Sequence, residues 1–283
     1  MTEIQPDPFN TETDATRTVD ERFESRVVMA VPEKDNEKLR RLIEIVNADD
    51  DLYGLWLASN VTAIQRLGMT DHGPVHVKIV MNMAVRMLRM LVNNDVVPSV
   101  TADWKLSSHD AEVVVALGAL LHDVGMSIQR ADHEDFSLFI AQEKLKEILP
   151  QIYDKRVSNV MRSEILHAII AHRSGGKPLT LEAGVVRISD ALDMAKGRSR
   201  IPFEAGSDSI HSISAAAIDS ISIDSGKERP ICITVRMTNS AGIFQLDQLF
   251  REKLKGSGIE PYVELKAKLK GEHEERLFKE FKI

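Results

Sequence analysis

Hydrophobic residues recur at helical spacing from about residue 36 to about residue 200. The first stretch places Leu39, Leu42, Ile43 and Val46 at positions i, i+3, i+4 and i+7, which lie on one face of a helix. Further helices are predicted at 52–67, where Gly68 ends the pattern, from Pro74 to about 91, at 108–123, from about 134, at 157–172 and at 180–194. This pattern predicts an all-helical domain over 35–204.

After Glu204 the pattern changes to the alternation of apolar and polar residues that is typical of strands. Predicted strands lie around 221–223, at 231–237 and at 262–267, and a helical stretch at 244–255 precedes the last one. A charged tail at 270–282 predicts a solvated helix. The sequence therefore predicts a mainly α protein, in which a small α+β domain of order β-β-α-β over 205–283 follows the helical domain. We expect this small domain to serve dimerisation or regulation.

Residues 1–34 are rich in threonine, aspartate, glutamate and proline and lack a sustained period. They predict a mobile leader with one short ordered piece at 26–31. The first residues are polar and acidic, unlike a signal peptide, and no apolar run approaches the roughly 18–20 residues that cross a bilayer. We therefore expect a cytoplasmic protein without membrane contact.

Composition narrows the classes of function. With 43% hydrophobic and 28% charged residues the chain can bury a core, which excludes general disorder. The net charge of −7 disfavours extended binding of nucleic acid, although a local basic cluster can still hold one phosphate. The single cysteine, Cys232, excludes an intramolecular disulfide and any cysteine-rich zinc module.

A histidine and an aspartate stand side by side where the apolar run 113–121 ends, just before Gly125: they are His122 and Asp123. An imidazole and a carboxylate are thus expected together at the end of a helix. His76 in turn heads the apolar stripe of the helix after Pro74. Each feature alone has a structural explanation, since a lone histidine on an apolar stripe is usually a core residue and the helix dipole favours a histidine at a C-terminus.

Several such residues follow one another along the helical domain, and together they are more informative than any single one. The candidate metal ligands are His76, His122, Asp123, His133, His172 and Asp190. Imidazole and carboxylate groups without thiolates suit Mn, Fe, Co, Ni, Zn or Mg. A set larger than four can hold two ions, and two ions about 3.5–4 Å apart are a standard arrangement for hydrolysing phosphate esters. The set therefore predicts a site for one or two divalent ions.

These residues resemble the pattern of the HD superfamily of metal-dependent phosphohydrolases. The pattern is a histidine that opens one helix, a His-Asp pair that ends another, and a distant aspartate on a later helix. Here these are His76 in His-Val-Lys-Ile-Val, His122-Asp123 in Leu-Leu-His-Asp-Val-Gly, and Asp190 in Arg-Ile-Ser-Asp-Ala-Leu-Asp-Met. The resemblance covers roughly 35–203. It implies that Asp123 bridges two ions, that His76, His122 and Asp190 complete one site, and that a metal-bound hydroxide attacks the phosphate, with Asp123 and His122 at the catalytic centre.

Members of this superfamily with two metal ions add two histidines between the His-Asp pair and the last aspartate. His133, which precedes an apolar helix, resembles the first of them. His167 and His172 compete for the second place, and because they are about 140° apart around a helix they cannot point the same way. We expect His172 to be the ligand, so that His133 and His172 complete the second site.

Basic residues beside the proposed ligands are candidates to hold phosphate oxygens through charge-assisted hydrogen bonds: Arg130, Arg173, Lys177, Lys196, Arg198 and Arg200. His72, His167 and Asp193 are candidates to orient a ligand without binding the ion themselves. The stretch 173–178 is similar in position to the Gly-Tyr-Pro signature of the branch that cleaves cyclic di-GMP. It lacks the tyrosine and the second consecutive histidine, and so does not indicate that substrate.

The sequence thus predicts a metal-dependent phosphohydrolase, acting on a phosphate mono- or diester of a nucleotide and forming a homo-oligomer. The alternative is a non-catalytic regulatory protein that binds metal or nucleotide and uses the C-terminal domain for partner or dimer contacts. Substitution at His122-Asp123 would have favoured the alternative, whereas the intact pair favours the enzyme.

Overall fold

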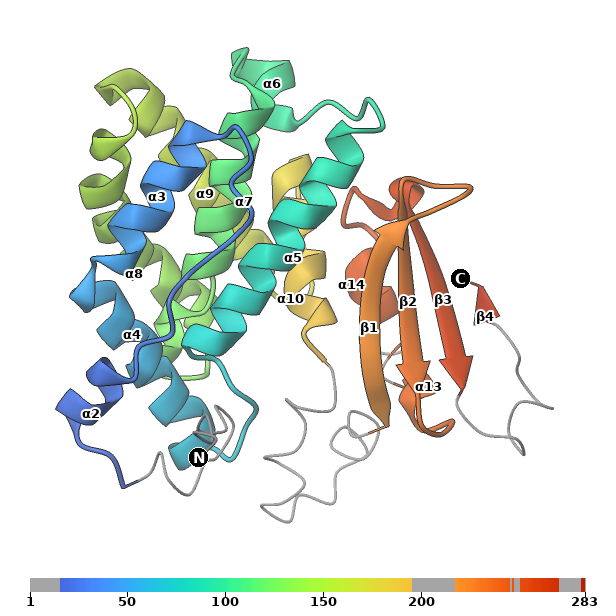
Figure 1. Ribbon diagram of the computed structural model, residues 1–283, viewed down its shortest axis with the longest axis horizontal. Coiled ribbons are helices and arrows are strands. Elements are labelled where there is room, and N and C mark those ends of the chain that lie inside the picture. Colours follow the sequence, from blue (N-terminus) through green and yellow to red (C-terminus); the bar gives the residue numbers. More distant parts are fainter. Residues whose placement is uncertain (1–15, 195–216, 245, 247–249, 270–280, 283) are drawn as a thin grey trace, which may run out of the picture.

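A helical bundle with a small sheet beside it makes up the computed structural model, which describes residues 16–194, 217–244, 246, 250–269 and 281–282 (Figure 1). The principal helices of the bundle are α3 (Glu37–Asn47), α4 (Asp50–Asn60), α5 (Pro74–Val92), α7 (Ser108–Leu121), α8 (His133–Ile148), α9 (Lys155–Ala171) and α10 (Leu181–Leu192). Shorter elements between them are the π-helix η1 (Val61–Arg66), α6 (Ser99–Trp104) and the 3₁₀ helices η2 (Val124–Ser127) and η3 (Leu149–Gln151). The prediction of a mainly α protein with a small α+β part is confirmed.

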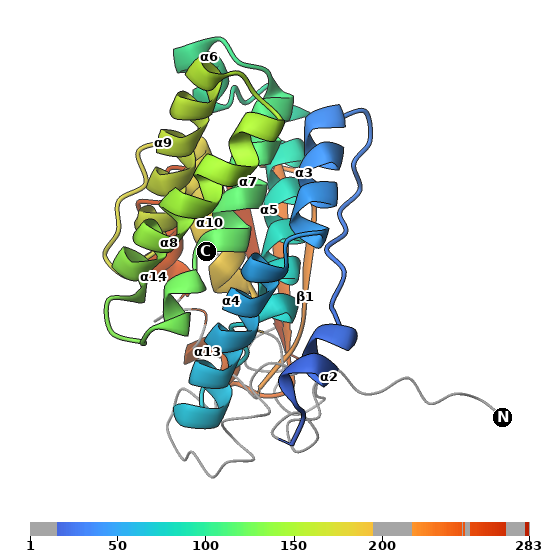
Figure 2. The same cartoon turned by 90° about the vertical axis from the view of Figure 1, so that its left-hand side faces the viewer.

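Helix α7 forms the centre of the bundle, with α3, α5, α9 and α10 packed around it (Figure 2). All its residues from Asp110 to Leu121 are buried, which explains why this stretch is apolar on every side rather than on one face. The indole Nε1 of Trp56 donates to the carbonyl oxygen of Leu120 at 2.8 Å and so ties α4 to the end of α7. The His-Asp pair therefore directly follows a helix that is buried in the centre of the bundle.

The small sheet has the order β1-β2-β3-β4, with β1 (Ile218–Ser225), β2 (Ile231–Met237), β3 (Val263–Leu269) and β4 (Phe281–Lys282). β1 pairs antiparallel with β2, and β2 pairs parallel with β3 in a register that places Ile233 beside Leu265. The connection from β2 to β3 contains α13 (Gly242–Phe244), α14 (Arg251–Leu254) and η5 (Glu260–Tyr262). α14 packs on α10, so this part of the connection faces the bundle (Figure 1).

Several predicted elements differ from the observed ones. The helix expected at 52–67 changes to a π-helix after Asn60. In the stretch expected to be helical at 244–255, the described residues 244, 246 and 250–254 are helical. Helix α6 is not predicted because it is too short to show an apolar period. A residue of α10, Glu182, caps its start, since the Glu182 carboxylate accepts hydrogen bonds from the backbone N–H groups of Ser99 and Val100. In the tail, residues 281–282 form a strand instead of a helix because they pair with β3, while 270–280 lie outside the described residues.

Of the expected leader, the structure describes residues 16–34, which include the piece at 26–31 that the sequence predicts to be ordered. Helix α2 (Val19–Glu24) begins with a capping box in which Thr18 and Glu21 bond to each other's backbone. Further on, the side chain of Asn47 pairs with both the N–H and the carbonyl of Met29, at 2.8 Å each, and Met29 is buried. These contacts attach the piece 26–31 to the last residue of α3. Among the described residues, no helix has the length and apolar composition needed to span a membrane.

Candidate metal centre

His76 is held rigidly in the first turn of α5. The carboxylate of Asp71 accepts hydrogen bonds from the backbone N–H groups of Gly73 and His76, at 3.2 and 3.1 Å, and so caps the helix start. A Cβ on Gly73 would lie 2.7 Å from the Cβ of Asn60, so only glycine allows this close approach. The imidazole Nδ1 donates to Asp193 at 2.6 Å, which turns Nε2 towards the interior.

His122 and Asp123 form the turn between α7 and η2. His122 Nδ1 donates to the carbonyl of Ala119 at 2.7 Å, so its Nε2 also faces inwards and lies 3.2 Å from the Nε2 of His76. Gly125 follows the pair where the chain passes the start of α8: a Cβ there would overlap the carbonyl oxygen of His133. The backbone N–H of Gly125 donates to the hydroxyl of Ser137 at 2.8 Å, which joins this turn to α8.

His133 and His172 approach the same aspartate from the other side. His133 opens α8 and its Nε2 lies 3.0 Å from Asp123 Oδ1, while its Nδ1 contacts Glu134 and the carbonyl of Arg130. His172 ends α9, its Nδ1 donates to the carbonyl of Ile169 at 2.5 Å, and its Nε2 lies 3.7 Å from Asp123 Oδ1. Both rings are buried.

Asp123 therefore divides its two oxygens between two pairs of histidines. Oδ2 lies 3.3 Å from His76 Nε2 and 3.2 Å from His122 Nε2, whereas Oδ1 faces the other pair. Asp190 Oδ1 lies 3.7 Å from the same two Nε2 atoms of His76 and His122. Within the part of the chain that the structure describes, three groups could each hold an ion: His76, His122 and Asp190; His122, Asp123 and His172; and His133, Glu134 and His172.

The electrostatics of the cluster show a shortage of positive charge. Burial by itself would lower the pKa of His122, but the carboxylates of Asp123 and Asp190 outweigh burial and raise this pKa to about 10. Burial likewise opposes protonation of His133, whose pKa the carboxylates of Asp123 and Glu134 raise to about 9. The two aspartates in turn have pKa values well below the usual range. The buried carboxylates thus stay ionised and need a neighbouring positive charge, which either protonated histidines or a metal ion can supply.

His172 behaves differently from the other two histidines. Its burial, reinforced by the neighbouring His122, lowers its pKa to about 4. His172 is therefore neutral near pH 7, which is the form of imidazole that can bind a metal ion.

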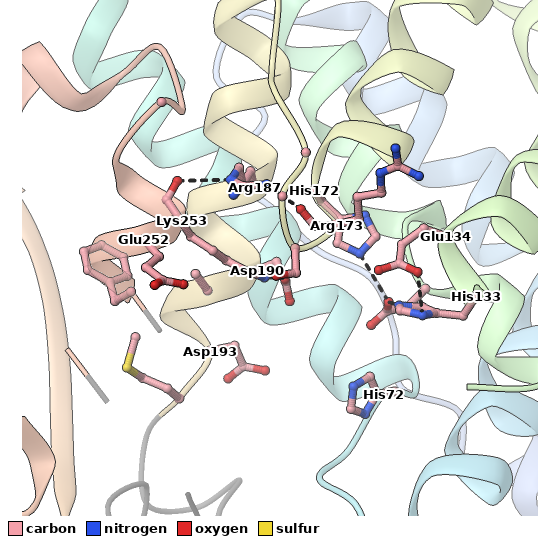
Figure 3. Close-up of a pocket in the computed structure, with 18 of the residues that line it drawn as sticks. His72, His133, Glu134, His172, Arg173, Arg187, Asp190, Asp193, Glu252 and Lys253 are labelled. Carbon is pink, nitrogen blue, oxygen red and sulfur yellow. Dashed lines mark hydrogen bonds and ion pairs between the residues drawn. The ribbon is translucent and has the colours of Figure 1, made fainter. Parts of the chain in front are cut away.

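A cavity of about 680 Å³ opens over this cluster. Asp123, His133, His172 and Asp190 line it, and so do three of the predicted phosphate-binding residues, Arg130, Arg173 and Lys177. Figure 3 shows that its walls come from the bundle on one side and from the α14 segment on the other. Lys196, Arg198 and Arg200, the other predicted phosphate-binding residues, lie outside the described residues.

The three predicted supporting residues have different positions. Asp193 contacts His76 directly, as stated above. His72 lines the cavity, and its Nδ1 donates to the carbonyl of Thr70 at 2.7 Å. His167 lies apart from the cluster, where its Nε2 accepts a hydrogen bond from the backbone of Leu179 at 2.9 Å. The structure thus brings His172 and not His167 to Asp123.

Sequence reasoning missed three residues of this region. Glu134 contacts His133 at 3.0 Å and could have been considered because it is adjacent in sequence. Arg187 is buried in α10, and Lys253 of α14 forms an ion pair with Asp190 at 2.6 Å. No local signal indicates Lys253, because the strands of the small sheet separate it from the HD-like motifs.

Comparison with known proteins agrees with the fold and the cluster. The family model of the HD domain matches residues 75–195, and the chain belongs to this family, whose members bind divalent metal ions and are typically metal-dependent hydrolases. The chain is also similar to the uncharacterized protein MJ1020 of Methanocaldococcus jannaschii: the two are 44% identical over 225 residues, which are 80% of this chain and 86% of that protein. No solved structure matches the chain significantly.

Proposed function

We propose that this protein is a phosphohydrolase that uses two divalent ions, with Asp123 between them, to hydrolyse a phosphate mono- or diester of a nucleotide. The observation that carries this proposal is the division of the Asp123 carboxylate, whose two oxygens face different pairs of histidines. Imidazole nitrogens at both oxygens of one carboxylate are expected when that carboxylate is shared by two ions, and not when it binds one ion or none.

The donor set fits metal ions in two respects. First, two ligands on one ion with bonds of about 2.0–2.2 Å lie about 2.8–3.1 Å apart in octahedral geometry and about 3.3–3.6 Å apart in tetrahedral geometry. The Nε2 atoms of His76 and His122 are 3.2 Å apart, and Asp123 Oδ2 lies at 3.3 and 3.2 Å from them. Asp190 Oδ1, at 3.7 Å from both nitrogens, needs only a small shift to join them.

Second, three of the rings carry the support that metal-binding histidines ordinarily have. A ligating imidazole donates its other N–H to a carboxylate or a backbone carbonyl. His76 donates to Asp193, and His122 and His172 donate to the carbonyls of Ala119 and Ile169. When neutral, each ring therefore presents an Nε2 lone pair to the aspartates, and such a convergence of acceptors calls for a cation.

His76, His122, Asp123 and Asp190 would hold one ion, and Asp123, His133 and His172 the other. Bound ions would polarise the phosphoryl oxygens and lower the pKa of water so that hydroxide forms near neutral pH. Arg130, Arg173 and Lys177 line the same cavity, and their cationic groups would hold phosphate oxygens. A cavity of about 680 Å³ matches pockets that enclose small organic ligands, which supports a nucleotide rather than a bare phosphate.

The test is the metal content of protein purified without chelator, measured together with hydrolysis of p-nitrophenyl phosphate, bis(p-nitrophenyl) phosphate and a panel of nucleotides. We expect about two transition-metal ions per chain, and loss of both the metal and the activity in Asp123→Ala. Asp135→Ala, which removes an exposed carboxylate from the first turn of α8, is the matched control and should keep both.

Three results would count against the proposal. Full metal content in Asp123→Ala would refute the shared ligand, and about one ion per chain would indicate a mononuclear enzyme. A protein that binds metal and nucleotides without turning any of them over would instead be the non-catalytic regulatory protein that the sequence also allows.

A further inference from the structure

Lys253 brings a positive charge from the C-terminal part of the chain to the edge of the metal centre. Its Nζ lies 2.6 Å from Asp190 Oδ2, while the other oxygen of the same carboxylate faces His76 and His122. Lys253 and Asp190 both line the cavity, and Figure 3 shows the lysine side chain reaching from the α14 side towards Asp190 of α10. The ammonium is therefore in direct contact with one of the proposed ligands, Asp190.

The position of Lys253 is fixed by contacts along α10. A Cβ on Gly184 would overlap the carbonyl oxygen of Ser257, so the segment after α14 packs directly on the helix backbone. One turn further, Arg187 Nε donates to the carbonyl of Lys253 at 3.0 Å. After another turn, Asp190 meets the lysine side chain. Three successive turns of α10 thus hold the segment from Lys253 to Ser257.

Arg187 also joins this segment to the proposed second metal site. Its Nη1 donates to the carbonyls of Ala171 and Arg173, the two residues on either side of His172, at 3.1 and 2.5 Å. The guanidinium is buried, and every one of these acceptors is a backbone oxygen. Arg187 is therefore a positioning residue, which holds Lys253 and His172 at a fixed separation.

The ammonium of Lys253 has capacity for a further partner. A lysine carries three N–H donors. Among the described residues Asp190 is the hydrogen-bond acceptor of Lys253, and about a quarter of the lysine side chain (26%) is exposed, towards the cavity. An ion pair whose role is stability alone does not require exposure to a cavity that is lined by candidate metal ligands. The buried neighbours of Lys253, Phe250 and Leu254, anchor the segment without it.

We propose that Lys253 binds a phosphate oxygen of the substrate, so that the C-terminal module completes the active site of the helical domain. This inference rests on the proposed function and names a further residue of the same site. When Asp190 shares its charge with a bound cation, the ammonium keeps a positive charge that an anionic phosphate can neutralise. The phosphate would then lie in the cavity that Lys253 lines together with Arg130 and Arg173.

The experiment compares the wild type with Lys253→Gln, Lys253→Arg and Lys268→Gln. Lys268 is an exposed lysine of β3 in the same module and is the matched control. Inorganic phosphate is titrated into each protein by calorimetry, with and without bound metal, and metal content, KM and kcat for the two nitrophenyl esters are measured on the same samples. A hydrogen bond to a charged group contributes about 1.5–3 kcal/mol, so Lys253→Gln should weaken phosphate binding and raise KM by about 10- to 100-fold.

Under the proposal, metal content does not change in Lys253→Gln, Lys253→Arg recovers part of the phosphate affinity, and Lys268→Gln matches the wild type. Unchanged phosphate affinity and KM in Lys253→Gln would overturn the inference and leave the hydrolase intact. Loss of metal from Lys253→Gln would also overturn it, because the lysine would then act by supporting Asp190. A wild type that hydrolyses neither ester but binds phosphate through Lys253 would refute the proposed function alone.

Discussion

Asp193 orients His76, because its Oδ2 accepts a hydrogen bond of 2.6 Å from the imidazole Nδ1. The two residues come from different helices: His76 opens α5, and Asp193 directly follows the last residue of α10. Asp190 stands one turn before Asp193 on the same helix. The end of α10 therefore contributes both a proposed ligand and the support of another ligand, which makes the distance between α5 and α10 critical for the site.

We predict that Asp193→Ala lowers metal affinity without removing a ligand. Loss of a carboxylate that orients a ligating histidine typically costs 10- to 100-fold in metal affinity. The measurement is a competition titration of the metal against a chromogenic chelator. Asp224→Ala, which removes an exposed carboxylate of β1 that pairs with Arg86, should bind metal like the wild type. Equal affinity in both variants would show that the His76–Asp193 contact has no role in metal binding.

Of the two histidines in and just after α9, replacement of only one should lower the metal content. His172→Ala removes a buried imidazole beside Asp123 Oδ1 and should lower the content from about two ions to about one. His167→Ala removes only an acceptor for the backbone of Leu179, which is worth about 0.5–1.5 kcal/mol of stability, and should keep both ions. Elemental analysis of the two variants measures their metal content. A large loss of metal in His167→Ala would mean that His167, and not His172, is the ligand.

Gly125 should be intolerant of any side chain. In Gly125→Ala the new Cβ would overlap the carbonyl oxygen of His133 and lie 2.5 Å from the backbone nitrogen of Ser137. Because both atoms are backbone, the turn or α8 must move, and we expect a loss of about 1–3 kcal/mol in the free energy of unfolding. The same movement separates His133 from Asp123, so metal content should fall as well. Denaturant unfolding and elemental analysis measure the two effects.

The control for this variant is Gly54→Ala in α4. A Cβ there meets nothing closer than 3.5 Å, and alanine is favoured over glycine inside a helix by about 1 kcal/mol. Gly54→Ala should therefore be as stable as the wild type or more stable, with full metal content. If Gly125→Ala behaved like Gly54→Ala, the close packing of the His-Asp turn on α8 would not be needed for the site.

Local patterns predicted most of the bundle because each principal helix has an apolar face or a recognisable start. The spacing of His76 before Val80 and Met87 was sufficient to place it on a core-facing row of α5, and the structure has it there. The apolar run before His122 likewise predicted the end of α7. The geometry of Asp123 could not be predicted in this way, since its neighbours approach from four helices.

Contacts that depend on the docking of distant segments were beyond local reasoning. Lys253 reaches Asp190 only because Gly184 allows the backbone of Ser257 to pack on α10, and no period in the sequence expresses that fit. The attachment of Met29 by the side chain of Asn47 is of the same kind. Contacts of this kind depend on how the whole chain packs. The sequence motifs therefore predicted the metal centre but not its contact with the C-terminal module.

The ion pair between Lys38 and Asp110 should make stability depend on pH. Asp110 is buried at the start of α7, where Ser107 donates to it from the backbone N–H and the hydroxyl, at 2.8 and 2.7 Å. Burial by itself would raise the pKa of Asp110, but the bonds from Lys38 and Ser107 outweigh it and hold this pKa below its usual value. Because the pKa is lower in the folded state, the charged carboxylate stabilises the fold at a pH above about 4, the usual carboxyl pKa of the unfolded chain. This contribution is lost as the pH falls through the folded-state pKa.

Asp110→Asn keeps the shape of the side chain and removes its charge, and we expect it to cost about 1–2 kcal/mol of unfolding free energy at pH 7. The difference from the wild type should shrink steadily as the pH is lowered from 5 to 3, which denaturant unfolding of the metal-free proteins measures. Glu143→Gln, which breaks an exposed pair with Lys146, should differ from the wild type by less than about 0.5 kcal/mol throughout. A constant difference between Asp110→Asn and the wild type over this range would mean that hydrogen bonding, and not the charge of Asp110, fixes the start of α7.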